Sequence, residues 1–263
     1  MIIIAILETQ KSMLQHRFVF NKRFEYNVDI LPSKIAIWEA YKPFLKGSGI
    51  FSVYEKKSFI STSSSLSSRI RLEALYNNLS QTISRYKATS KHAEPNEFRV
   101  AELGGGTFIT TRLISIIIEK ANLSFKSFDV YDTFKGLPKS KYQPELDDLE
   151  GLFHGSLDKF HEKLSEFAFA KPIPGLVPSS LPEDDASQYD FVHIDLDLYE
   201  GTLGGLNHFF PRMKKLGIIQ LDDYNSNPWD GVNDAVDEFL SCQNGDDYFF
   251  QTIPLGGAYI VKI

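Results

Sequence analysis

Residues 99–106 have the sequence RVAELGGG, a short strand pattern that runs directly into three glycines. An apolar helical pattern follows at 110–120, and a second strand pattern at 125–131 ends at Asp132. The alternation continues along the chain, with strands predicted at 172–176, 190–194, 217–221 and twice within 248–263, and helices at 157–169, 202–215 and 232–240. Strands that alternate with helices pair in parallel, and two final strands with a tight connection favour an antiparallel edge. The pattern therefore predicts a doubly wound α/β fold with a mostly parallel seven-stranded sheet.

The three glycines form the first candidate binding loop. Gly104, Gly105 and Gly106 stand between a strand and a helix, where glycine lets the backbone turn sharply and approach a ligand. Glu102, at the strand end, adds a carboxylate that can accept from an ammonium or hydroxyl group. The third glycine of a GxGxxG dinucleotide loop is missing, because Ile109 occupies its position. This favours a nucleoside with an amino-acid tail, such as S-adenosylmethionine, over a pyrophosphate cofactor; a glycine turn without a ligand is the alternative.

Asp132 is the next candidate for the cofactor site. It ends the second predicted strand, 28 residues after Gly104. In doubly wound folds an acid at this position accepts hydrogen bonds from ribose hydroxyls. A lone aspartate at a strand end also serves as a turn or helix cap. Both interpretations of Asp132 stay open from the sequence.

Four aspartates follow the fourth and fifth predicted strands. Asp195 ends the stretch FVHID, Asp197 comes two residues later, and Asp222 and Asp223 follow the stretch GIIQL. Neighbouring strands lie about 4.8 Å apart, and their carboxyl ends border the ligand crevice of an open α/β sheet. Three or four of these carboxylates are therefore expected to converge on one spot. The alternative is that they only cap the helices that follow.

Clustered carboxylates repel one another and raise each other's pKa unless a cation intervenes. Ligand sets made only of oxygen select a hard ion such as Mg²⁺, Mn²⁺ or Ca²⁺. An ion at this position, beside the cofactor, could bind a substrate hydroxyl and lower its pKa. The aspartates thus predict a divalent-metal site next to the glycine loop.

The composition excludes several classes of protein. The chain has 263 residues, a net charge of −6 and a single cysteine, which rules out an intrachain disulfide and a Cys₄ or Cys₂His₂ zinc site. With 28 basic against 34 acidic residues, a nucleic-acid partner is not expected. The apolar run at residues 2–7 is too short to span a bilayer and lacks the features of a signal peptide. We therefore expect a soluble, cytoplasmic protein with no membrane partner.

The N-terminal third lacks the strand and helix alternation. Apolar residues at helical spacing predict an amphipathic helix at 69–86, and the serine-rich stretch at 61–68 predicts a mobile loop. We therefore divide the chain into an N-terminal, mainly helical extension over 1–97 and a cofactor-binding domain over 98–263.

Five segments of that domain together resemble the macrocin O-methyltransferase (TylF-like) family. They are VAELGGGTF (100–108), YDTFKGLP (131–138), IPGLVPSSLP (173–182), FVHIDLDLYEGT (191–202) and LDDYNSNPWDGVNDAVDEF (221–239). The aspartate-tyrosine segment and the DDY segment are specific in combination, whereas the glycine loop alone is not. The resemblance implies a class I methyltransferase (Rossmann-like) fold, S-adenosylmethionine as cofactor, and Mg²⁺ or Mn²⁺. It also implies O-methylation of a hydroxyl, commonly on a sugar of a glycosylated natural product.

The resemblance also implies roles for single residues. By position, Asp195, Asp222 and Asp223 match the metal ligands of the family, and Asp197 matches its proposed general base. Glu102, Gly104 and Asp132 match the cofactor loop and the ribose acid. The family's N-terminal region forms helices that close over the cofactor, so residues 1–97 are expected to act as a lid.

One position departs from the family pattern. Phe108 stands where the family usually has a glycine, with Gly105 and Gly106 brought forward. The contacts between the loop and the cofactor are therefore expected to differ from those of the family.

Two other functions compete with this prediction. A nicotinamide-dependent oxidoreductase is suggested by Tyr131 and Lys135, which form a YxxxK pattern, but the pattern follows the second strand, where no catalytic helix is expected. A non-catalytic cofactor-binding protein on the same fold would not need the aspartates. The sequence leaves open the identity of the small hydroxylated acceptor and whether the chain forms a homo-oligomer.

Overall fold

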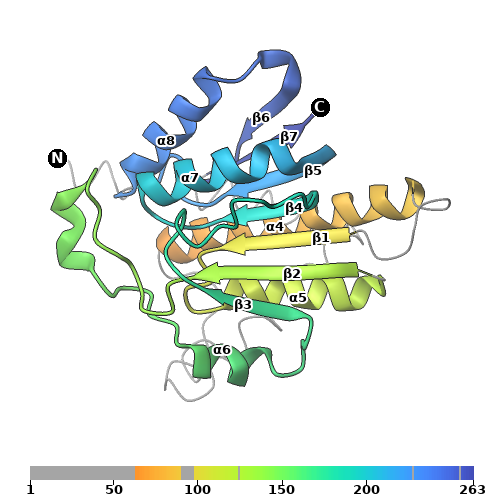
Figure 1. The fold of residues 1–263 in the computed structure, drawn as a ribbon, viewed down its shortest axis with the longest axis horizontal. Coiled ribbons are helices and arrows are strands. Elements are labelled where there is room, and N and C mark those ends of the chain that lie inside the picture. Colours follow the sequence, from red (N-terminus) through yellow and green to blue (C-terminus); the bar gives the residue numbers. More distant parts are fainter. Residues whose placement is uncertain (1–62, 90–97, 124, 227, 255) are drawn as a thin grey trace.

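The sheet has seven strands in the order β3-β2-β1-β4-β5-β7-β6 (Figure 1). A computed structural model describes residues 63–89, 98–123, 125–226, 228–254 and 256–263. The strands are β1 (Phe98–Leu103), β2 (Phe125–Asp132), β3 (Ala170–Pro174), β4 (Tyr189–Ile194), β5 (Met213–Leu221), β6 (Tyr248–Thr252) and β7 (Ala258–Lys262). Strand β7 runs antiparallel to both β5 and β6, whereas β1 to β5 pair in parallel. This confirms the predicted mostly parallel sheet with an antiparallel edge.

Helices cover both faces of the sheet. One face carries α4 (Ser63–Thr89), α5 (Ile109–Ala121) and α6 (Leu157–Leu164), and the other carries α7 (Tyr199–Phe209) and α8 (Asp230–Ser241). In the described ranges, three short 3₁₀ helices lie in the connections: η2 (Pro144–Leu149), η3 (Phe210–Arg212) and η4 (Gly245–Asp247). None of the helices in the described ranges has the length and apolar character needed to cross a bilayer.

The alternation of side chains along the strands gives the sheet two separate cores. In β1 and β4, Val100 and Phe191 are buried under α4 and α5, while Ala101 and Val192 are buried under α7 and α8. Such burial on both faces is typical of parallel strands between helical layers. It explains why the strand segments are almost continuously apolar rather than alternating with polar residues.

Helix α4 is part of the core. Leu75 and Leu79, on its apolar side, are fully buried against the sheet and α5. Asn78 Nδ2 donates to Oε1 of Gln220 on β5 at 2.9 Å. The helix predicted at 69–86 is therefore confirmed, and its packing fixes one end of the N-terminal region on the sheet. The closing movement expected of residues 1–97 stays a prediction.

Three sequence predictions about element boundaries were wrong. The helix predicted at 202–215 ends at Phe209, because Pro211 cannot continue it, and β5 begins at Met213. The helix predicted at 157–169 ends at Leu164, after which single turns lead into β3. The serine-rich stretch is helical from Ser63 onward. The apolar run at residues 2–7 lies outside the described residues.

Candidate active site

The predicted site residues gather where the parallel strands end. Backbone hydrogen bonds continue past the strands, from Asp195 N to Leu103 O at 2.8 Å and from Asp222 N to Ile194 O at 2.9 Å. The loops that follow β1, β4 and β5 are therefore held side by side at one edge of the sheet. The arrowheads of β1 and β2 mark this edge in Figure 1, and the first turns of α4 lie beside it.

The glycine loop requires glycine at its first position. Gly104 has φ +87°, and a Cβ atom placed there would lie 1.7 Å from the carbonyl oxygen of Asp195. Gly106 also has a positive φ, +50°. The loop after β1 therefore passes so close to the loop after β4 that no side chain fits between them at Gly104. The backbone of this loop lines the cavities.

Phe108 supports this loop from the core side. Its backbone is left-handed (φ +68°) at the start of α5, and its N–H donates to Gly105 O at 2.6 Å. The ring is fully buried and packs edge-to-face on Phe160, with centroids 5.3 Å apart. Phe108, the residue that departs from the family pattern, thus packs in the core beneath the loop. The cavities beside the loop are lined by the glycines and not by Phe108.

Asp132 ties two loops together. Its Oδ2 accepts from Gly106 N at 2.9 Å and its Oδ1 accepts from Phe134 N at 2.6 Å. Burial raises the pKa of Asp132, and these backbone hydrogen bonds oppose the shift. Asp132 also lines a cavity. The hydrogen bond from Phe134 is the turn cap that the sequence left open for Asp132, whereas the sequence did not predict the contact with Gly106. The contact with ribose stays a prediction.

Glu102 lies behind the glycine loop and is fully buried. Its Oε1 is 3.2 Å from Nδ1 of His193, its neighbour in the sheet register. Within the described part of the chain, Glu102 Oε2 and His193 Nε2 have no hydrogen-bond partner. Buried polar atoms are rarely left unpaired without a reason. His193 lines the second cavity, so its Nε2 is available to a ligand or to water, whereas Glu102 lines neither of the two cavities beside the loop.

Two cavities of about 260 Å³ each meet at the loop. Both are lined by Gly104, Gly106, Phe153, Asp195 and Asp197. The first extends from Asp132 to the loop after β3, and the second extends from His193 to α4. Together they reach the size of a usual ligand site.

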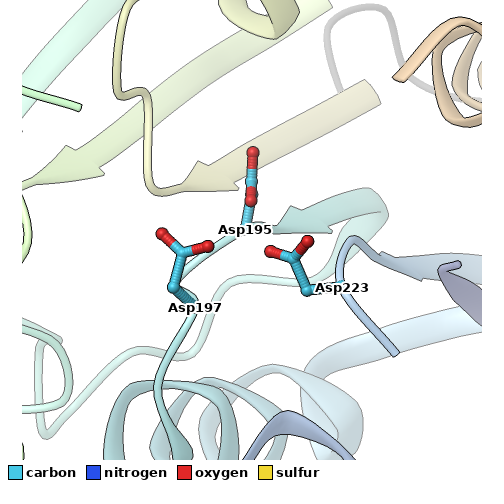
Figure 2. Close-up of side chains that lie close together, drawn as sticks. All are labelled: Asp195, Asp197 and Asp223. Atoms are coloured by element: carbon cyan, nitrogen blue, oxygen red, sulfur yellow. The ribbon is translucent and has the colours of Figure 1, made fainter. Parts of the chain in front are cut away.

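Three carboxylates point toward a common space between the two cavities. Asp195, Asp197 and Asp223 each offer an oxygen atom, and these atoms lie within 4.8 Å of one another (Figure 2). Asp197 and Asp223 have left-handed backbones, with φ of 62° and 41°, a conformation that aspartate tolerates better than most residues. The predicted convergence of these three residues is present in the structure.

Asp222 lies beside this group and faces Arg71 of α4. Arg71 Nη1 donates to Asp223 Oδ1 at 3.0 Å. Arg71 Nε lies 3.1 Å from Asp222 Oδ2 as an ion pair, without the geometry of a hydrogen bond. The arginine thus bridges the two aspartates that follow β5.

The cluster carries more negative charge than Arg71 can balance. Burial, followed by the charge of the neighbouring aspartates, raises the pKa of Asp195 and Asp197 well above the usual range and that of Asp222 to about 6. Arg71 opposes all three shifts. Four carboxylates face one guanidinium, and hard oxygen donors in this arrangement fit a divalent ion such as Mg²⁺ or Mn²⁺.

Sequence reasoning missed Arg71 because nothing in its local pattern marks it. It is one of four basic residues in α4 and lies 152 positions from Asp223. Trp229, which lines the second cavity, lies just before α8 and was passed over in the same way. Both residues reach the site only through the packing of helices on the sheet.

Known proteins match both the fold and the sequence. The structure is similar to the O-methyltransferase NovP (TM-score 0.60, 20% identity, 71% of this chain and 78% of that chain). It is also similar to the calicheamicin methyltransferase CalS11 (TM-score 0.55, 17% identity, 87% of this chain and 91% of that chain). These likenesses confirm the class I methyltransferase fold.

A curated relative from Streptomyces olivaceus is 25% identical over 121 residues, which are 42% of this chain and 45% of that protein. Its name is 8-demethyl-8-(2,3-dimethoxy-α-L-rhamnosyl)-tetracenomycin-C 4′-O-methyltransferase. The matched part thus spans less than half the length of this relative. The family model for macrocin O-methyltransferase (TylF) matches residues 72–258, and the chain therefore belongs to this family.

Proposed function

We propose that this chain is an S-adenosylmethionine- and divalent-metal-dependent O-methyltransferase that acts on a sugar hydroxyl of a glycosylated small molecule. The observation that carries the proposal is the convergence of Asp195, Asp197 and Asp223 beside the cavities at the glycine loop. Family membership supports the type of reaction. The name of the Streptomyces relative supports a glycosylated acceptor.

The residues around the glycine loop fit S-adenosylmethionine, which supplies an electrophilic methyl group when bound. Gly104, Gly105 and Gly106 present backbone to the cavities, and Asp132 lines one of them at the end of β2. Glu102 Oε2 and His193 Nε2 are unpaired on the neighbouring strands β1 and β4 that lead to the loop, and His193 lines the second cavity. We assign the ribose to Asp132 and the amino-acid tail to the side of the loop where Glu102 lies.

The carboxylates fit a divalent ion, which lowers the pKa of a coordinated hydroxyl when bound. We assign Asp195, Asp222 and Asp223 as its ligands. Asp195 and Asp223 already face the common space, whereas Asp222 is paired with Arg71. To bind the ion, Asp222 would have to turn away from Arg71 Nε, which lies 3.1 Å from its Oδ2.

Asp197 is assigned as the general base. It lines both cavities, and burial with the nearby Asp223 raises its pKa well above the usual range. A base whose pKa lies nearer the working pH accepts a proton more readily from a hydroxyl. The remaining task of the site is to hold oxygen, methyl carbon and sulfur in line at about 3–3.5 Å.

The oxidoreductase alternative loses support from the position of Tyr131. Its ring is buried and packs on Phe209 of α7, with centroids 6.0 Å apart. Burial raises the pKa of Tyr131 to about 12. Its hydroxyl therefore lies in the core rather than beside Lys135 in a catalytic pair.

Methyl transfer from labelled S-adenosylmethionine tests the proposal. The full chain is treated with EDTA, dialysed and assayed with a panel of glycosides, with and without added Mg²⁺. We expect methylation of at least one glycoside only when Mg²⁺ is restored. Cofactor binding without transfer to any member of a broad panel would favour the non-catalytic alternative, and full activity after exhaustive chelation would refute the role of the metal.

A further inference from the structure

Arg71 is held in the site by more than its own charge. Its side chain is only 15% exposed, although α4 lies on the outside of the sheet. Gln220 Nε2 of β5 donates to the Arg71 carbonyl at 3.3 Å, and Gln220 Oε1 accepts from Asn78, about two helical turns further along α4. The start of α4 is therefore fixed on β5 just below the two aspartates.

The Arg71 guanidinium contacts carboxylate oxygen atoms that a bound metal ion would also use. Nη1 donates to Oδ1 of Asp223, and Nε faces Oδ2 of Asp222. A divalent ion bound by Asp195, Asp222 and Asp223 would thus lie next to a fixed positive charge. Like charges in a partly buried site repel strongly, because the effective dielectric constant there is about 20 rather than 80.

We propose that Arg71 is a positioning residue that competes with the divalent ion for Asp222 and Asp223. It holds the two carboxylates in place and weakens the binding of the ion. This inference rests on the proposed function, since it assumes that the cluster binds metal. It assigns to α4 a part in setting the metal affinity of the site.

Mn²⁺ binding to the full chain at fixed pH tests this role without any acceptor. We compare the unmodified protein with Arg71→Gln and Arg71→Lys by calorimetry after removal of metal. Arg71→Gln removes the competing charge, so it should bind Mn²⁺ about tenfold more tightly or better, and its thermal midpoint without metal should fall. Arg71→Lys keeps the charge but loses the two-pronged contact, and its affinity should lie between the other two.

Arg85 provides the matched control on the same helix. It donates to Leu216 O and Thr82 Oγ1, away from the aspartates, so Arg85→Gln should leave Mn²⁺ binding unchanged. If the unmodified chain bound Mn²⁺ and both Arg71 variants bound it equally well or more weakly, the proposed competition would be refuted. The proposed metal site would still stand. If no version of the chain bound Mn²⁺, the proposed metal site would fail as well. If Arg71→Gln did not fold, the comparison with Arg71→Lys would still decide the question.

Discussion

Replacement of Asp132 by asparagine should loosen the glycine loop. The carboxylate accepts one hydrogen bond from Gly106 N and one from Phe134 N. Asparagine offers a single oxygen, so one N–H loses its acceptor and faces an NH₂ group. A hydrogen bond to a charged group contributes about 1.5–3 kcal/mol. The free energy of unfolding should fall by about that amount, and the affinity for S-adenosylhomocysteine by about 10- to 150-fold.

Calorimetric titration with S-adenosylhomocysteine and thermal unfolding measure the two effects. Asp129→Asn is the matched control, because Asp129 lies on the same strand, bonds to Ser127 and is away from the loop. Asp129 accepts one side-chain hydrogen bond, from Ser127, which the oxygen of asparagine can still accept, so Asp129→Asn should leave affinity and stability nearly unchanged. Unchanged affinity and stability in Asp132→Asn would show that these two hydrogen bonds do not support the site.

Two further predictions concern the loop and the carboxylates. Gly104→Ala should abolish cofactor binding, because its Cβ would overlap the Asp195 carbonyl, whereas Gly245→Ala, with open space around it, should bind normally; equal affinities in calorimetry would contradict this. Raised pKa values at Asp197 and Asp222 mean that the folded chain binds more protons than the unfolded chain above pH about 4. The stability of the chelated protein should therefore fall as pH rises through about 6, and saturating Mg²⁺ should reduce this slope; a rise in stability over that range would be inconsistent.

The fold was largely predictable because strand and helix patterns alternate after residue 98. Ends of elements were harder, since Pro211 and local turns decide them rather than periodicity. The positions of the aspartates followed from one rule, that parallel strands end at the same edge of the sheet. This rule places Asp195 and Asp223 together without any knowledge of their side chains.

The remaining features of the site depend on contacts between distant segments. Arg71 reaches the aspartates because α4 packs on β5 through Leu79 and Asn78, and no local pattern encodes that contact. The contact of Asp132 with the glycine loop depends on the close approach of two loops. Phe108 appeared as a departure from a family pattern, and only its burial shows that it acts in the core.

The division of roles within the aspartate cluster is tested most directly by Asp197→Asn. With an accepted glycoside, saturating Mg²⁺ and saturating S-adenosylmethionine, the rate of methyl transfer in a single turnover is compared with that of the unmodified chain. We predict a rate lower by about 10²- to 10⁴-fold, the usual scale for the loss of a general base, while Mn²⁺ and cofactor affinities stay nearly unchanged. An unchanged rate, or loss of Mn²⁺ binding in this variant with Mn²⁺ binding retained in Asp195→Asn, would contradict the assignment of Asp197 as base and Asp195 as metal ligand.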